Sequence, residues 1–365
     1  MTQRSDELPK HIRDTLAFYN DNYESLTYTQ KIQDSLKIRL CSEIPKSCRY
    51  CGKGENKVSF KTECHVLLEA LGNRRLFAED ECDNCNGLFG RSIENHFGKW
   101  SLPFRTVSCV KGKRGFPKMA RDPYWRIESS PAGLNISMRE DWKIGHVDEP
   151  NKIVCLDLLR DPYVPIAVYK TFVRMALALM PREELKNFQQ VVTWILCEDH
   201  TVQLNNCCSK ILYSLIPQIA PPDTVSASLS RRFTNDLNSP YMVFVLCFSN
   251  YVFQACLPAP ESLQNRNFSV TFSPLLFGPD HNHPIKPKIL DLSGTAIVRD
   301  DTEPFIFSFE SVESHQMSAH ENISTRAYFL WENNGKREGQ DLANWLEAER
   351  QITSAMAIPL PIQKH

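Results

Sequence analysis

The chain has 365 residues, of which 42% are hydrophobic and 23% charged, and its formal net charge is −1. This composition is ordinary for a globular protein, and the length allows two or three domains. The absence of any apolar run of about 18 residues argues against a membrane span. The polar residues Met1–Lys10 lack the apolar stretch of a secretory signal, so we expect a cytoplasmic protein with no membrane partner.

Residues 1–45 are predicted to be mainly helical. Apolar residues are spaced among polar ones along this stretch, and Pro45 closes it. The apolar positions are Ile12, Leu16, Tyr19, Ile32, Leu36, Ile38 and Leu40.

Four of the thirteen cysteines are regularly spaced. Cys48 and Cys51 form one CxxC pair, Cys82 and Cys85 form a second, and thirty residues separate the pairs. Two such pairs are typical of a zinc site, because each bends tightly around one ion and four thiolates complete a tetrahedron. A site closed by four cysteines has no open position, so the expected Zn²⁺ is structural. Further cysteines lie in apolar runs and are predicted to be small buried residues rather than disulfides: Cys155, Cys197, Cys247 and Cys256.

The segment between the two cysteine pairs is predicted to contain a strand. Val58–Val66 has strand composition, and period-two alternation puts Glu63 and His65 on one face with Cys64 on the other. After the second pair, a helix is expected to begin at Asn86. The predicted order is therefore strand, loop, cysteine pair and helix.

This order resembles the HNH endonuclease superfamily, in the variety with two zinc knuckles around the active site. The resemblance covers about residues 46–118 and is carried by the CxxC pairs, the His65–Asn73 stretch and the step from Cys85-Asn86 into Phe89-Gly90. It implies that His65 is the general base and that Asn86 binds a catalytic divalent ion such as Mg²⁺. Histidine has a suitable pKa for deprotonating water, and an amide oxygen suits a hard cation. The implied substrate is DNA, and many HNH enzymes act as homodimers.

The sequence departs from the family pattern at two positions. Many HNH proteins carry an acidic metal ligand immediately before the base, where this chain has Cys64, and a proline where it has Leu68. A thiolate is a poor ligand for Mg²⁺. Two candidates remain for the missing carboxylate, Glu63 beside His65 and Glu94 on the predicted helix.

A basic stretch follows the cysteine region. From Lys99 to Arg126 there are eight basic residues and one acidic residue. Such a stretch, interleaved with aromatic residues and glycines, is expected to follow a phosphate backbone beside the cleft, and a solvated basic loop is the alternative. The predicted nucleic-acid contacts are Arg105, Lys111, Lys113, Arg114 and Lys118. Residues 46–149 are thus predicted to be a nuclease module with a basic extension, which ends in a strand at Leu134–Met138.

Residues 150–315 are predicted to form a mixed α+β domain. No catalytic pattern occurs in it, and His281-Asn282-His283 is expected to lie in an exposed loop between prolines. A recognition or sensing role is the hypothesis for this domain. The expected helices are Val164–Met180 and Glu183–Cys197, and the expected strands are Tyr241–Phe248 and Tyr251–Leu257 in a hairpin, Phe268–Phe272 and Phe305–Phe309.

Residues 316–365 are predicted to form a helical hairpin and a tail. Two helical patterns flank a turn at Gly335–Gly339. The stretch from Arg326 to Glu349 resembles a short bacterial domain of unknown function, which implies a bacterial source and no particular activity.

The sequence therefore predicts an α+β protein in which a small zinc-stapled ββα-metal nuclease module is joined to a larger mixed α+β domain and a C-terminal helical hairpin. The leading hypothesis is a metal-dependent HNH endonuclease that hydrolyses DNA, with defence against foreign DNA as a role suggested by analogy. The alternative is a catalytically degenerate zinc-ribbon module that binds nucleic acid or a protein partner. A zinc hydrolase of small molecules is disfavoured, because four cysteines close the evident zinc site.

Overall fold

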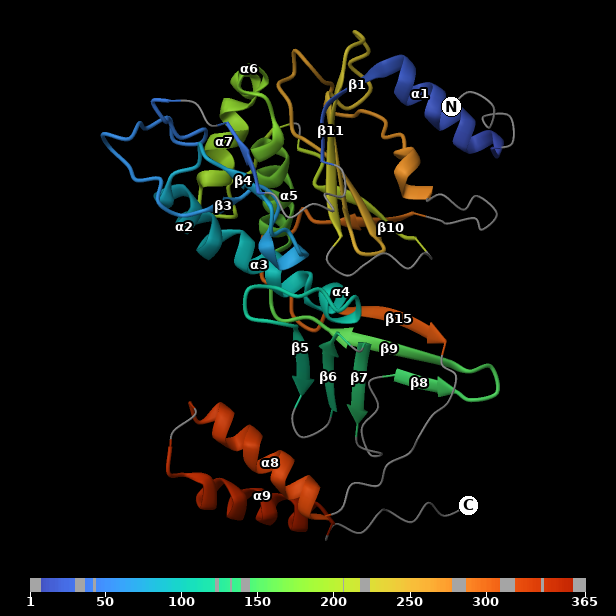
Figure 1. Ribbon diagram of the computed structural model, residues 1–365. Coiled ribbons are helices and arrows are strands. Elements are labelled where there is room, and N and C mark those ends of the chain that lie inside the picture. The colour runs from blue at the N-terminus through green and yellow to red at the C-terminus, as the bar shows by residue number, and fades with distance from the viewer. Residues whose placement is uncertain are drawn as a thin grey trace. The chain divides into compact units, whose positions relative to one another are not determined.

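The computed structural model describes residues 8–29, 37–41, 44–121, 125–131, 133–138, 145–205, 207–216, 224–277, 287–308, 319–335 and 338–356. The predicted loop at His281–His283 lies outside these ranges. The chain divides into two compact units, one of residues 1–117, 128–134 and 159–303, the other of residues 118–127, 135–158 and 304–365. Both units contain strands and helices, so the fold class is α+β (Figure 1).

A six-stranded antiparallel sheet is the main element of the first unit (Figure 1). The predicted hairpin is confirmed, since Phe248 lies opposite Tyr251 across a tight turn in which Ser249 has a φ of 48°. The sheet is buried on both faces, which explains the nearly continuous apolar sequence of its central strands. In spatial order the strands are β1 (Tyr23–Thr29), β11 (Val225–Arg232), β12 (Met242–Phe248), β13 (Tyr251–Cys256), β10 (Lys210–Leu215) and β14 (Lys288–Asp291).

Helices cover the two faces of this sheet. Val252 of β13 belongs to a core cluster that contacts Phe18 of helix α1 (Lys10–Asn22). The next residue, Phe253, faces the opposite side and packs on Phe172 of helix α5 (Pro165–Leu179), with ring centroids 5.8 Å apart. Every residue of α5 is buried, so this helix is the centre of the first unit.

Two predictions for this unit are wrong in detail. The helix expected at Glu183–Cys197 is broken into α6 (Arg182–Leu185), a 3₁₀ turn (η3, Lys186–Phe188) and α7 (Gln189–Leu196), because the buried Phe188 leaves helical geometry. Phe268–Phe272 is not a strand. The side-chain amide of Gln254 donates to the carbonyl of Thr271 at 3.0 Å, so a side chain takes the place of a partner strand there.

The cysteine region folds as a small sheet followed by short helices. Strand β4 (Leu76–Ala78) pairs in parallel with β2 (Ile38–Leu40) and antiparallel with β3 (Cys64–His65). A 3₁₀ turn, η2 (Glu69–Leu71), lies between β3 and β4. The helices are α2 (Asp83–Ser92), α3 (Glu94–Trp100) and α4 (Leu102–Val107).

The structure corrects three element boundaries near the N-terminus. The predicted strand at 58–66 is reduced to Cys64–His65, because the N–H groups of Lys61 and Thr62 donate to the carboxylate of Asp83 instead of to a strand. The helix expected to begin at Asn86 begins three residues earlier. The N-terminal region is helical only in α1 among its described residues, and it continues into β1 and β2.

The second unit includes most of two small sheets and a helical hairpin. The strands predicted at Leu134–Met138 and Phe305–Phe309 correspond to β7 and β15. The hairpin is also confirmed: α8 (Ala319–Asn333) packs on α9 (Asp341–Met356), and Arg326 donates to Gln351 across it at 2.6 Å. The described helices are all too short or too polar to cross a bilayer. In the first of these sheets the strand order is β5 (Lys118–Arg121), β6 (Trp125–Ser130), β7 (Gly133–Met138). In the second it is β15 (Thr302–Ser308), β9 (Ile153–Leu159), β8 (Gly145–Asp148).

Candidate functional site

The four regularly spaced cysteines come together in space, as predicted. The sulfur atoms of Cys48, Cys51, Cys82 and Cys85 all lie within 4.8 Å of one another. Gly52 has a φ of 68°, and its N–H donates to the carbonyl of Cys48 at 2.9 Å, which closes the tight turn of the first pair. The second pair is placed by the start of α2, where Cys82 is the N-cap.

This donor set is compatible with structural zinc. The sulfur atoms of Cys51 and Cys82 are 3.7 Å apart, close to the separation of about 3.8 Å for thiolates bound tetrahedrally at about 2.3 Å. The sulfur of Cys48 accepts a hydrogen bond from the Cys85 thiol, which lowers the pKa of Cys48 and raises that of Cys85. Four thiolates this close repel one another, and a divalent cation among them removes that repulsion.

His65 lies on β3, opposite Phe77 of β4. The two rings pack with centroids 4.8 Å apart, and Nε2 of His65 lies 3.6 Å from Oε2 of Glu69. Its Nδ1 is buried and has no hydrogen-bond partner among the described residues. Burial lowers the pKa of His65 below its ordinary value, while Glu69 opposes and Arg174 reinforces this change. His65 is therefore a neutral imidazole at pH 7, the form that accepts a proton.

The loop after His65 is held in shape by Asn73. Its amide nitrogen donates to the carbonyls of Leu67 (2.6 Å) and Leu76 (2.9 Å), and its amide oxygen accepts from the N–H groups of Arg75 (3.2 Å) and Leu76 (3.0 Å). One buried side chain thus joins both ends of the loop. Asn73 therefore fixes the shape of the loop between β3 and β4.

Arg74 connects the same loop to the basic stretch. Its Nη1 lies 3.5 Å from Oε1 of Glu69, and its Nη2 donates to the carbonyls of Lys111 (2.8 Å) and Gly112 (3.3 Å). Gly112 pairs with Gly115 across a tight turn. We call residues 111–115 the basic turn. It is anchored beside the carboxylate that faces His65.

The predicted nucleic-acid contacts lie in different environments. Lys111, Lys113 and Arg114 are exposed on the basic turn. Arg105 of α4 instead donates to the hydroxyl of Ser101 and to the carbonyl of Gly98 on α3, and burial lowers its pKa to about 10. Lys118 is exposed and begins β5, in the second unit.

The two residues before His65 point to different surroundings. Glu63 is exposed, and its carboxylate lies 2.8 Å from the amine of Lys37 and 2.7 Å from the guanidinium of Arg39. Cys64 is buried, and its sulfur contacts the carbonyl of Glu81 at 3.5 Å. Burial raises the pKa of the Cys64 thiol well above its ordinary range, so it stays protonated and is no ligand for a hard cation.

Two further predicted ligands lie on the helices. Asn86 is the fourth residue of α2, directly after Cys85, and is half-buried. Glu94 opens α3 and is also half-buried, with Oε1 3.5 Å from Nε of Arg174. Burial raises the pKa of the Glu94 carboxyl, and Arg174 opposes that effect.

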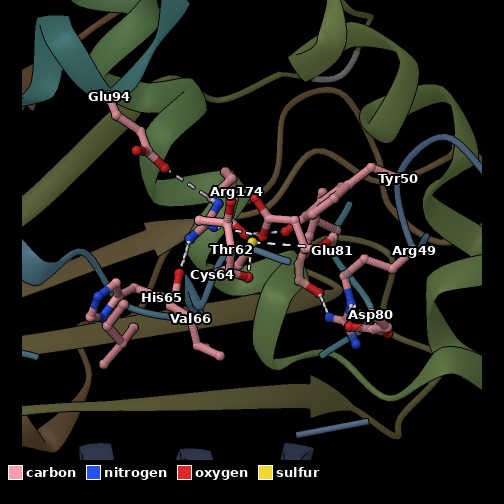
Figure 2. A network of polar contacts seen from close by, with 12 residues as sticks. Arg49, Tyr50, Thr62, Cys64, His65, Val66, Asp80, Glu81, Glu94 and Arg174 are labelled. Atoms are coloured by element: carbon pink, nitrogen blue, oxygen red, sulfur yellow. Dashed lines mark hydrogen bonds and ion pairs between the residues drawn. The ribbon is translucent and has the colours of Figure 1, made fainter. Parts of the chain in front are cut away.

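Sequence reasoning missed two buried charged residues at this site. The guanidinium of Arg174, on α5, lies 2.7 Å from Oε2 of Glu81, and neither side chain is more than 1% exposed (Figure 2). Burial raises the pKa of Glu81 to about 7. Arg174 also donates to the main-chain oxygens of His65 and Val66. The signal in the sequence was a single arginine within the apolar pattern of α5.

Comparison with known families agrees with this geometry. Residues 48–102 match the family model described as HNH endonuclease, and residues 318–354 match a model described as a protein of unknown function (DUF2934). No curated protein and no solved structure matches the chain. The first matched segment contains the cysteine cluster, His65, Asn73 and Asn86. Residues 48–102 of this chain are therefore similar to the HNH endonuclease family.

Proposed function

We propose that the HNH domain hydrolyses phosphodiester bonds of DNA, with His65 as the general base. The observation that carries this proposal is the setting of His65. Its imidazole is kept neutral by burial, and the carboxylate of Glu69 lies 3.6 Å from its Nε2. His65 also lies between the two cysteine pairs, in the segment that the cysteine cluster holds in place. A general base must be held at a fixed position in this way.

In the proposed reaction, His65 takes a proton from the water that attacks phosphorus, the bond from phosphorus to the leaving sugar oxygen breaks, and solvent protonates that oxygen. The imidazole becomes cationic as it takes its proton, and the Glu69 carboxylate stabilises that charge and holds the ring in orientation. Lys113 and Arg114, exposed on the basic turn, bind phosphates that flank the scissile bond. These contacts set the position of the backbone and carry no base sequence information.

A divalent ion such as Mg²⁺ would be held by the amide oxygen of Asn86 and the carboxylate of Glu94. When bound, it supplies positive charge at the scissile phosphate. Both side chains offer the hard oxygen atoms that such a cation prefers, and both are half-buried. Glu63 is the weaker candidate ligand, because both its oxygens pair closely with Lys37 and Arg39, at 2.8 and 2.7 Å. Among the described residues, Glu94 instead has only one oxygen near a cation, 3.5 Å from Arg174.

Cleavage of supercoiled plasmid DNA by the purified full chain tests this proposal. With Mg²⁺, Mn²⁺ or Ni²⁺ present, we expect nicked and linear products, and their rate of formation should fall by about 10²- to 10⁴-fold in His65→Ala. Asn86→Ala should raise the metal concentration needed for half-maximal rate. Intact plasmid under every metal condition, or equal rates for wild type and His65→Ala, would reject hydrolysis by this site.

A second candidate function is binding of nucleic acid without cleavage. It is favoured by the position before the base, where Cys64 is buried and protonated rather than a metal ligand. Under this alternative the zinc cluster and the basic turn form a docking surface only. A wild-type protein that binds duplex DNA, loses affinity as salt is raised and never cuts would support it.

A further inference from the structure

We infer that Arg174, which lies on α5 outside the matched HNH segment, is a positioning residue for His65. Its guanidinium fixes the main chain from which the imidazole of His65 projects. This inference rests on the proposed role of His65 as the base. It makes α5, a helix of the large sheet domain, part of the machinery of the HNH site.

The contacts of Arg174 converge on β3. One nitrogen, Nη1, donates to the carbonyl oxygens of both His65 (2.6 Å) and Val66 (2.9 Å). The other terminal nitrogen donates to Oε2 of Glu81 at 2.7 Å, and Nε lies 3.5 Å from Oε1 of Glu94. In Figure 2 the two main-chain oxygens face the guanidinium, whereas the imidazole of His65 points away from it. Arg174 thus holds the backbone of the base without touching its ring.

The strand that carries His65 needs such support. β3 has two residues and is the outer strand of its sheet, so within the described ranges β4 is the one strand that pairs with it. Two ladder positions, Cys64 opposite Ala78 and His65 opposite Phe77, restrain its orientation weakly. The hydrogen bonds from Arg174 to the carbonyls of His65 and Val66 add a restraint on β3 besides its pairing with β4.

Arg174 also contacts the helix that follows the second cysteine pair. Its guanidinium carbon lies 5.8 Å from the centre of the Phe89 ring, on α2. Asn86, the proposed metal ligand, lies three residues before Phe89 on the same helix. One side chain therefore touches both the strand of the base and the helix of the proposed ligand, and so relates the two halves of the site.

Fold stability alone is a poor explanation for this arginine. All residues of α5 are buried, and a charged pair in such a place costs desolvation energy that an apolar pair of similar volume avoids. Glu81 balances the charge, yet its Oε1 has no hydrogen-bond partner in the described structure. The contacts that an apolar replacement cannot reproduce are those to the carbonyls of His65 and Val66.

The test uses the full chain and a charge-balanced double variant, Arg174→Met with Glu81→Gln, which removes both buried charges together. We expect it to keep its zinc and a melting temperature near that of the wild type. Its kcat for plasmid cleavage should fall by about 10²-fold, the order of loss for a misplaced catalytic group. KM should stay within about threefold, because the basic turn is untouched.

A readout independent of cleavage keeps this inference separate from the proposed function. The imidazole signals of His65, observed by NMR and assigned with His65→Ala, should shift and broaden in the double variant. Unchanged signals would overturn the positioning role, even if the chain proves to be no nuclease. A double variant that cuts at the wild-type rate would overturn it equally.

Two further variants guard against misfolding. Arg174→Lys keeps the charge beside Glu81 but lacks the fork that reaches two carbonyls, so we expect stable protein with reduced kcat and shifted His65 signals. Lys170→Met is the matched control. Lys170 is a buried cation one turn earlier on α5 that donates to the carbonyl of Cys197. Its loss should leave the His65 signals unchanged, and an equal shift there would mean that any buried cation of α5 has this effect.

Discussion

Nε2 of His65 lies 3.6 Å from Oε2 of Glu69, four residues later in the chain. The 3₁₀ turn η2 starts at Glu69 and brings the carboxylate back toward β3. The other oxygen of that carboxylate lies 3.5 Å from Arg74, whose second nitrogen holds the basic turn. Imidazole, carboxylate and guanidinium therefore connect the proposed base to the proposed phosphate-binding surface.

Replacement of Glu69 by glutamine should slow cleavage without unfolding the chain. The amide keeps the shape of the side chain but no longer stabilises the imidazolium that forms during the reaction. We expect kcat to fall by about tenfold, less than for removal of the base itself, because the 3.6 Å separation exceeds that of a strong hydrogen bond. Single-turnover cleavage rates measure the effect, and an unchanged rate would show that Glu69 has no part in the reaction.

Loss of one cysteine of the cluster should remove the metal and the local fold together. Serine in place of Cys85 breaks the tetrahedral donor set, so the zinc content should fall from about one ion per chain toward zero. Metal analysis of the purified protein gives this number, and the amide NMR signals of α2 report the fold. The matched control is Cys64→Ala, which removes a buried thiol nearby that is no member of the cluster. A zinc loss equal in both variants would contradict the four-cysteine assignment.

Restoring the family's acidic residue before the base should harm this protein. Cys64 is 1% exposed, and its thiol lies against the main chain of Glu81, whose buried carboxylate repels a second negative charge. We therefore expect Cys64→Asp to lower the free energy of unfolding by on the order of 2–3 kcal/mol. Urea denaturation measures this. A stable Cys64→Asp variant with faster Mg²⁺-dependent cleavage would instead mean that the side chain turns into the metal site.

Charge reversal on the basic turn should weaken DNA binding in a salt-dependent way. Lys113→Glu with Arg114→Glu removes two phosphate contacts, so the slope of log affinity against log salt should become shallower by about 0.9 for each contact. Fluorescence anisotropy with labelled duplex DNA at several salt concentrations gives this slope. The control for net charge is Lys186→Glu with Lys210→Glu, which reverses two exposed lysines of η3 and β10. If both proteins lose the same affinity, the basic turn is no specific docking surface.

The spacing of the four cysteines was enough to predict their cluster, because the chemistry of a tetrahedral thiolate site constrains the sequence locally. The register of His65 and Asn86 with those pairs predicted them as site residues, and their roles stay a prediction. The boundaries of β3 and α2 were missed, because Asp83 takes the backbone N–H groups that a longer strand would have used. A hydrogen bond from the backbone to a distant side chain produces no periodic pattern in the sequence, so it cannot be predicted from periodicity.

Arg174 shows a different limit of the sequence. It lies 109 residues after His65, and nothing in the spacing between them indicates contact. The apolar periodicity of α5 predicts a buried helix, but it does not indicate what a single arginine within that helix contacts. Contacts of this kind are fixed by the packing of α5 against the small sheet, which depends on the whole tertiary structure.

The stability of the folded chain should fall as the pH is lowered, in part through His96. Its Nδ1 accepts a hydrogen bond from the N–H of Val164 at 3.1 Å, and burial, with a smaller effect of His200 and Lys99, lowers its pKa to about 4. Between its ordinary pKa of about 6.5 and this value, the unfolded chain binds a proton at His96 that the folded chain does not, so acid favours unfolding there. His96→Asn keeps an acceptor for Val164 but does not titrate. The difference in urea midpoint between pH 7 and pH 5 should therefore be smaller in His96→Asn than in the wild type. An equal difference would show that His96 is protonated to the same extent in both states.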